Sequence, residues 1–261
     1  MKVGFIGCGN MGGALARAVS KVDGVEIHLY DKDTEKAASL AREIGATVGD
    51  MASVVASDYL FLGVKPNMVG AVLGEASPLI DKSTVIISMA AGVAIEKIER
   101  ALGRPEVGII RIMPNTPVAY GEGMILYSVS GGAVDSEAGF LTIMKYAGTL
   151  DKIPEALIDA GSAVSGCGPA FVYMFIEALA DGGVAAGLPR DKAMLYAMRT
   201  VLGAATMALE SGKHPAELKD MVCSPGGSTI EGVLALEDGG MRGVVADAVI
   251  AAFEKTKLLG K

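Results

Sequence analysis

The sequence predicts an α/β fold in its first part and an all-helical second part, and three observations support this. Up to residue 153, short apolar runs with β character alternate with runs of helical period, which is typical of parallel strands joined by crossover helices. A glycine-rich turn directly follows the first apolar run. After residue 153 only helical periods occur. We therefore expect one domain over residues 1–153 and a second, helical domain over residues 154–261.

The individual elements follow from this alternation. The expected strands cover residues 2–7, 25–30, 59–64, 84–89, 108–113 and 123–129. The expected helices of the first domain cover residues 10–22, 34–45, 68–80 and 94–103. Those of the second domain cover residues 169–187, 190–212, 230–237 and 242–260, with a stop at Gly187-Leu188-Pro189 between the first two.

The helices of the second domain are more apolar than a lone soluble domain needs. Hydrophobic residues make up 51% of the chain and the mean hydropathy is +0.44. The longest apolar stretch carries Glu177 and Asp181, whereas a membrane-spanning helix needs about 20 residues with few or no charges. We therefore expect a buried or subunit-interface helix, self-association of the chain, and no membrane partner.

Charge and cysteine content limit the remaining classes of function. The net charge of −7 disfavours a nucleic-acid partner, which requires a clustered basic face. The three cysteines, Cys8, Cys167 and Cys223, are widely spaced and form no CxxC pair, so neither a disulfide framework nor a metal site is expected. The first residues run into a strand without a cleavable signal, which favours a cytoplasmic protein.

The glycine-rich turn predicts a dinucleotide site. Gly7, Gly9 and Gly12 form G-x-G-x-x-G between the first strand and the first helix. The first glycine permits the tight turn, the second lets the backbone approach a pyrophosphate, and the third lets the helix pack on the strand. Asp31 closes the second strand about 20 residues later, which is the context that this motif requires.

Asp31 and Lys32 bear on the choice of cofactor. A carboxylate at this position accepts hydrogen bonds from a ribose 2′-hydroxyl and repels a 2′-phosphate, which favours NAD. Lys32 could instead meet a phosphate. The pair therefore leaves NADH and NADPH both open.

Three later strand ends are rich in small residues and prolines. They read "GVKPN" (63–67), "SMAAGV" (88–93) and "RIMPNTP" (111–117). Ligands of open α/β sheets bind outside the carboxyl ends of the strands, so we expect room for a flat ring there. Lys65 is a candidate to neutralise a phosphate or carboxylate.

A second glycine-rich turn, "CSPGGSTIEG", precedes the helix expected at 230–237. Free N–H groups at Gly227, Ser228 and Thr229, with the hydroxyls, would make an uncharged anion site suited to a carboxylate. The alternative is a capping box between Ser228 and Glu231. That alternative does not explain the Gly226-Gly227 pair or Thr229.

The set "GFIGCGNM", "VKP", "RIMPNTP", "SGCGPAF" and "CSPGGSTIEGVLALE" resembles the pyrroline-5-carboxylate reductases, from Val3 to about Lys257. The resemblance implies a Rossmann-type dinucleotide-binding domain and a helical domain that interlocks with a second subunit. It implies a homodimer, or a larger assembly up to a decamer. It also implies reduction of 1-pyrroline-5-carboxylate to proline, the final step of proline biosynthesis, with hydride from NADPH or NADH.

The same resemblance assigns roles residue by residue. Cys8, Asn10 and Met11 line the pyrophosphate turn, and Asp50 stands near the adenosine ribose. The nicotinamide side is flanked by Gly63, Val64, Lys65, Pro66, Ala90, Ala91 and Asn115. Glu155 is an acidic residue near the substrate. The substrate carboxylate and imine are held by the loop that contains Ser224, Gly226, Gly227, Ser228 and Thr229.

In the predicted mechanism the substrate imine is already largely protonated, so the site needs orientation rather than a strong acid. The Thr229 hydroxyl bonds the ring nitrogen, and Ser224 is the second catalytic residue. His28 is expected to pack on a strand and His214 to start a helix, so neither serves as the base of an alcohol dehydrogenase. Two alternatives remain: a β-hydroxyacid dehydrogenase-like oxidoreductase, and a non-catalytic NAD(P)-sensing module.

Overall fold

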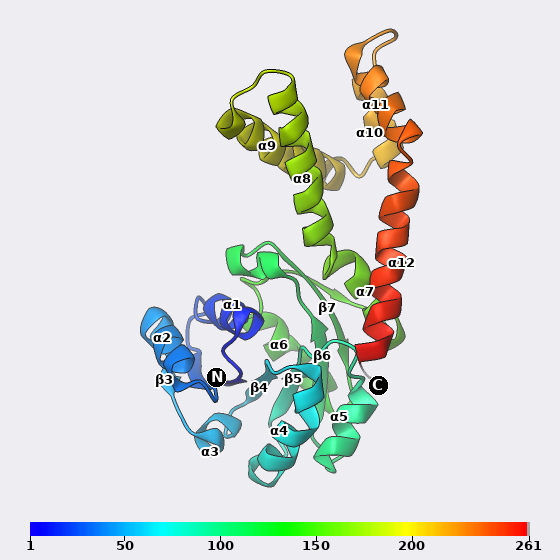
Figure 1. Cartoon of the computed structure of the whole chain (residues 1–261). Helices are drawn as coiled ribbons and strands as arrows, with labels where there is room; N and C mark the ends of the chain where they lie inside the picture. The colour runs from blue at the N-terminus through cyan, green and yellow to red at the C-terminus, as the bar shows by residue number, and fades with distance from the viewer. Residues whose placement is uncertain (260–261) are drawn as a thin grey trace. The chain divides into compact units, whose positions relative to one another are not determined.

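The computed structural model describes residues 1–259, whose course is shown in Figure 1. Contacts divide the chain into two compact units. The sheet unit contains Met1–Cys167 and the segment from Ala251 onward, and the helical unit contains Gly168–Ile250. Each unit is described by itself.

Within residues 1–259, eight strands form one sheet in the order β3-β2-β1-β4-β5-β6-β7-β8. Their bounds are β1 Lys2–Ile6, β2 Glu26–Tyr30, β3 Thr47–Val48, β4 Tyr59–Leu62, β5 Val85–Ser88, β6 Gly108–Met113, β7 Gly123–Val129 and β8 Gly148–Lys152. All neighbouring pairs are parallel except β6 and β7. The predicted α/β class is confirmed, and β3 and β8 are strands that the sequence did not predict.

The helices of the sheet unit alternate with these strands. They are α1 Asn10–Val19, α2 Thr34–Ile44, α3 Met51–Val55, α4 Val69–Ala76, α5 Ile95–Leu102, α6 Glu137–Ile143 and α7 Glu155–Ser165. Local signals set the ends of α2: the Asp33 side chain accepts a hydrogen bond from the Lys36 N–H, and Gly45 follows with φ 71°. The helices α3, α6 and α7 were not predicted.

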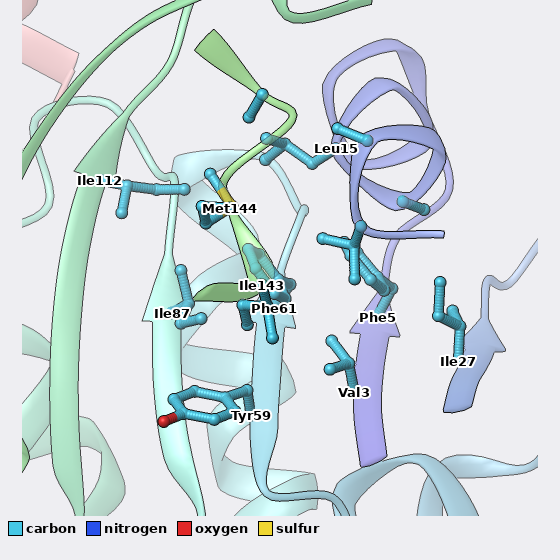
Figure 2. Close-up of a cluster of buried hydrophobic side chains, with 14 of the residues drawn as sticks. Val3, Phe5, Leu15, Ile27, Tyr59, Phe61, Ile87, Ile112, Ile143 and Met144 are labelled. Atoms are coloured by element: carbon cyan, nitrogen blue, oxygen red, sulfur yellow. The ribbon is translucent and has the colours of Figure 1, made fainter. Parts of the chain in front are cut away.

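The core of the sheet unit lies on both faces of the sheet, as the period of two along each strand requires. On one face Val3, Phe5 and Phe61 belong to the cluster that covers α1, α2 and α6. Figure 2 shows this cluster, in which the Phe5 and Phe61 rings are stacked with centroids 4.4 Å apart. On the other face the alternate residues, including Ile6 and Leu62, pack with α3, α4 and α5.

Helix α7 belongs to the sheet unit through its contacts. Ile158 is fully buried against Met113 of β6 and Leu126 of β7. The division by contacts at Cys167 therefore falls after α7, whereas the expected domain boundary falls before it. The domain boundary at residue 153 stays a prediction.

The helical unit is built from α8 Gly168–Ala185, α9 Arg190–Ser211, α10 Pro215–Val222, α11 Ser228–Asp238 and the first part of α12 Met241–Leu259. From Glu155 onward the described chain is thus helical, as predicted. Gly260, the last residue of one expected helix, lies outside the described residues. His214 is the N-cap of α10, where its Nδ1 accepts a hydrogen bond from the Ala216 N–H at 3.2 Å. The expected helix-start role of His214 is confirmed.

The helical unit has almost no core of its own. Within residues 168–250 the buried residues are Ala180, Ala193 and Ala197, at the contact of α8 with α9. Large apolar side chains are exposed instead, among them Tyr173, Met174 and Leu209. A groove of about 500 Å³ runs between α8, α11 and α12 of this unit, lined by Phe171, Phe175 and other apolar residues. Over Glu155–Ala185 the chain is long and apolar enough, by length and composition, to cross a membrane.

Candidate active site

A cleft of about 410 Å³ lies at the carboxyl ends of β1, β2 and β4. The sheet order places β1 between β2 and β4, so the chain turns to opposite sides of β1 at this point, which is where open α/β sheets bind ligands. Seven of the predicted cofactor-binding residues line the cleft: Gly7, Gly9, Asp31, Lys32, Gly63, Val64 and Lys65. The others on its wall, which sequence reasoning missed, are Ile6, Tyr30, Lys36, Met51, Met68, Val72 and Glu75.

The three glycines of the turn differ in their surroundings. Gly7 and Gly12 are too crowded for any side chain, whereas Gly9 has open space beside it. Gly7 has φ 100°, and a Cβ there would lie 2.5 Å from the Gly63 carbonyl oxygen. A Cβ at Gly12 would lie 2.1 Å from the Gly7 carbonyl oxygen. At Gly9, by contrast, a Cβ would meet no described atom within 4 Å. This open side, at the N-terminus of α1, fits a pyrophosphate held by helix N–H groups.

Asp31 is held rigidly on the rim of this cleft. Its Oδ2 accepts a hydrogen bond from the Cys8 N–H at 2.7 Å, and its Oδ1 accepts one from the Asp33 N–H at 2.9 Å. Burial, and then the charge of Asp31, raise the pKa of the Cys8 thiol to about 12. Cys8 is therefore a neutral thiol at physiological pH and does not act as a nucleophile.

A second hollow, of about 270 Å³, adjoins the cleft and shares Gly9 and Lys36 with it. Cys8 and Asn10 of the predicted turn lie on its wall, together with Arg17, Ser39 and Leu40. Its two cations are both paired. Arg17 makes two 2.6 Å hydrogen bonds to Glu43, and Lys36 lies 3.2 Å from Asp33.

The other predicted cofactor residues line neither hollow: Met11, Gly12, Asp50, Pro66, Ala90, Ala91 and Asn115. Asp50 caps α3 by accepting the Ser53 N–H at 2.8 Å. The Asn115 amide is buried and bridges the Met124 N–H and the Ser165 carbonyl, both at 2.9 Å. The role of these residues in cofactor binding stays a prediction.

A partly buried charge cluster ties α7 to the sheet. Arg111 of β6 is 3% exposed and contacts two carboxylates one turn apart on α7, Glu155 at 3.2 Å and Asp159. The same Glu155 Oε1 accepts the Ile95 N–H at the start of α5, at 2.7 Å. Glu155, predicted as a substrate contact, is thus engaged by two protein partners.

The second glycine turn opens α11, with two differences from expectation. Gly227 is the N-cap, Ser228 is the first helical residue, and no side chain caps the helix, so the capping-box alternative is wrong. The Gly227 N–H donates to the Ser224 carbonyl at 3.0 Å and so is not free as predicted. Ser228 and Thr229, both exposed, occupy the first turn, where helix N–H groups have no intrahelical acceptor.

Two further features of this turn are compatible with the predicted anion site. Gly226 has φ 66°, a conformation that favours glycine. The hydroxyls of Ser224, Ser228 and Thr229 are exposed around it. In the described part of the chain, no three His, Cys, Asp or Glu side chains gather as a metal site would require.

Comparison with known families gives two matches. Residues 155–259 match the pyrroline-5-carboxylate reductase dimerisation family, and residues 2–92 match the family described as NADP oxidoreductase, coenzyme F420-dependent. The first match begins at the residue that opens α7.

Whole proteins similar to the chain carry the same description. The pyrroline-5-carboxylate reductase of Escherichia coli (strain K12) is 42% identical over 100% of this chain and 98% of its own. That of Pisum sativum is 40% identical over 98% of this chain and 95% of its own. Among solved structures, pyrroline carboxylate reductase of Plasmodium falciparum with NADP bound is 32% identical, with a TM-score of 0.88 over 100% of this chain and 98% of that one.

Proposed function

The chain belongs to the pyrroline-5-carboxylate reductase family, and we propose that its Ser224–Thr229 turn holds the substrate while the glycine cleft of the sheet unit holds the reduced dinucleotide. It is an NAD(P)H-dependent oxidoreductase that reduces the cyclic imine 1-pyrroline-5-carboxylate to L-proline, in proline biosynthesis. The predicted function is confirmed in preference to the hydroxyacid dehydrogenase and the sensor. The assignment of individual residues is the proposal.

The cofactor site is assigned to the residues that form the turn and rim of the 410 Å³ cleft. Gly7, Gly9 and Gly12 with Cys8, Asn10 and Met11 take the pyrophosphate, because the open side of Gly9 leaves the backbone N–H groups accessible. Asp31 and Lys32 take the adenosine ribose, with Asp50. Gly63, Val64, Lys65, Pro66, Ala90, Ala91 and Asn115 are assigned to the nicotinamide side.

The substrate site is assigned to the turn that precedes α11. The observation that carries this proposal is a helix N-terminus that opens on two glycines with no side-chain cap, beside three exposed hydroxyls. N–H groups at Ser228 and Thr229 would receive the substrate carboxylate without placing a formal charge near the imine. Gly226 and Gly227 have no side chains that would block the substrate carboxylate from these N–H groups. Glu155 stays a predicted contact of the substrate.

The chemistry needs orientation more than proton transfer, because a cyclic imine is substantially protonated near neutral pH. The Thr229 hydroxyl would bond the ring nitrogen and Ser224 would fix the carboxylate, so the C=N carbon presents one face. When bound, the reduced nicotinamide supplies a hydride to that carbon, and the C=N π electrons become the nitrogen lone pair of proline. No nucleophilic thiol is required, in agreement with the raised pKa of Cys8.

We also propose that the chain works as a homodimer, or a larger assembly such as a decamer, in the cytoplasm, without nucleic-acid or membrane partners. The exposed apolar side chains of the helical unit support this, since contiguous patches of this kind mark protein interfaces. Within the apolar stretch Glu155–Ala185, the exposed apolar side chains of α8 would then face a second subunit rather than a membrane. Light scattering of the purified chain tests the assembly, and a monomer at micromolar concentration would contradict it.

Replacement of the Thr229 hydroxyl tests the residue assignment. We expect Thr229→Ala to lower kcat for 1-pyrroline-5-carboxylate roughly ten- to a thousandfold, the cost of one oriented donor. Thr229→Ser, which restores the hydroxyl, should recover most of the rate. Dinucleotide binding should be unchanged in both variants.

The matched control is Thr206→Ala on α9, whose hydroxyl bonds the Leu202 carbonyl of its own helix at 2.9 Å. This variant should keep full activity. Full activity in Thr229→Ala would remove Thr229 from the mechanism, whereas no turnover by the wild-type chain with either dinucleotide would contradict the function itself.

A further inference from the structure

The rim of the dinucleotide cleft carries a carboxylate that cannot turn away from it. Asp31 ends β2 and both of its oxygens accept a backbone N–H, one from the glycine turn at Cys8 and one from Asp33 at the start of α2. A carboxylate oxygen has more than one acceptor site, so each keeps capacity for a further donor. Two elements therefore fix one negative charge on the cleft wall.

Two of the four cations that line the two hollows are paired with other carboxylates. Lys36, which lines both hollows, is paired with Asp33. Arg17 of the adjoining hollow is held by Glu43 through two hydrogen bonds. Lys32 is exposed, and Glu75 adds another acidic side chain to the cleft wall. Lys65 is a third lysine on the wall, and the charges of Lys32, Lys36 and Lys65 cancel those of Asp31, Asp33 and Glu75, so an added anion meets no net attraction.

We propose that Asp31 makes this chain prefer NADH to NADPH. The inference rests on the assignment of the cleft to the dinucleotide in the proposed function. In NADH the ribose 2′-hydroxyl donates to the Asp31 carboxylate, a charge-assisted hydrogen bond. In NADPH a 2′-phosphate replaces that donor by up to two negative charges beside a fixed negative charge.

The size of the preference follows from Coulomb's law. A unit of like charge about 4 Å away weakens binding by about a factor of five in bulk water, and by more at a partly enclosed surface. A phosphate that is close to doubly charged, and that also loses the hydrogen bond, should therefore bind about ten- to a hundredfold more weakly. Because Lys32 on the cleft wall attracts the 2′-phosphate, we expect the ratio to lie nearer tenfold than a hundredfold.

The test is a binding titration of the full-length chain without substrate, by nicotinamide fluorescence, with NADH and NADPH at physiological salt. For the wild type we expect the dissociation constant of NADPH to exceed that of NADH about ten- to a hundredfold. For Asp31→Asn we expect the two constants to lie within about threefold of each other, because the charge is gone. Asp31→Ser is a second variant, should the asparagine amide not tolerate the Cys8 N–H.

The matched control is Glu35→Gln, which removes one exposed negative charge from the first turn of α2 without altering the cleft wall. The ratio of the two constants should stay within about twofold of the wild type, because solvent and salt screen an exposed charge that does not line the cleft. Thermal stabilisation by each dinucleotide gives a second readout.

Tighter binding of NADPH by the wild type, or an unchanged ratio in a folded Asp31 variant, would overturn the inference while leaving the reductase function intact. Failure to bind either dinucleotide would instead contradict the cofactor assignment, and the inference with it.

Discussion

The sheet unit buries its large apolar side chains, whereas the helical unit leaves side chains of the same types exposed. In the sheet unit Phe61 is fully buried and stacked on Phe5, whereas in the helical unit Phe175 is 36% exposed on the wall of an open groove. One unit completes its core within the chain, and the other leaves its apolar faces for contacts beyond it. Apolar composition thus predicts that a helix will be buried, but not that its own chain will bury it.

The largest effect should come from breaking the completed core. We expect Phe61→Ala to lower the free energy of unfolding by about 3–5 kcal/mol, from lost burial and the cavity left behind. Denaturant titration followed by circular dichroism measures it. If the same loss followed from Phe175→Ala at high dilution, the contrast between the two units would be false.

The next largest contrast is between thiols of the two units. Because the pKa of Cys8 is raised from 9.0 to about 12, its thiolate fraction near pH 8 is about a thousandfold below that of an ordinary thiol. Cys223, half-buried in the turn before α11, should react with iodoacetamide at least about a hundredfold faster than Cys8. Mass spectrometry of the labelled peptides measures both rates.

The same shift predicts a pH dependence of stability. The Cys8 thiol has a higher pKa in the folded protein than in the unfolded chain, so folding favours its protonated form. The stability that this contributes is fully present below pH 9.0 and is lost as pH rises from 9.0 toward about 12. Cys8→Ala should therefore remove part of the alkaline fall in stability. Equal labelling rates for Cys8 and Cys223 would contradict the buried, charge-opposed environment of Cys8.

A smaller effect should come from the charge cluster that ties α7 to the sheet. Arg111→Met leaves Glu155 and Asp159 without their shared cation and should cost about 2–3 kcal/mol, less than a fully buried pair because both carboxylates reach solvent. Arg100→Met, which removes an exposed pair with Glu96 on α5, is the control and should change stability by less than about 0.5 kcal/mol. If both variants lost the same free energy of unfolding, the cluster around Arg111 would have no special structural role.

The smallest of these effects concerns the exposed apolar groove of the helical unit, which Phe175 lines. Phe175→Ala should raise the dissociation constant of the assembly about five- to thirtyfold, the usual loss for one interface side chain of this kind. Analytical ultracentrifugation measures it. As a control, Leu79→Ala, which truncates an even more exposed apolar residue of the sheet unit, should leave assembly unchanged. The reverse result would place the interface on the sheet unit.

The sequence predicted the elements whose pattern is local. Six strands showed period-two or fully apolar runs, and the structure contains all six. β3 and β8 escaped notice because one has two residues and the other, Gly148–Lys152, is largely exposed and carries Asp151 and Lys152. Such edge strands form because a neighbouring strand offers hydrogen bonds, and this is tertiary information.

The candidate site divides in the same way. Asp31 could be predicted because it closes a strand at a fixed distance from the glycine turn, and it lies on the cleft wall. Lys36, Met51 and Glu75 reach that wall from three different helices, and no short-range pattern marks them. The capping-box hypothesis at Ser228 was wrong because the residue before it, a glycine without a side chain, takes the N-cap position.

The contact of Gly7, Gly12 and Gly63 has a consequence for how such a protein can change. A single methyl group at Gly12 would collide with the Gly7 carbonyl, and one at Gly7 would collide with Gly63. These three backbone segments therefore tolerate no substitution without a shift of the chain at the carboxyl ends of β1 and β4. Evolution or design that changes which dinucleotide the enzyme uses is therefore confined to the side chains between Asp31 and Lys36, and there a change at Asp31 or Asp33 also removes the backbone hydrogen bonds that these carboxylates accept.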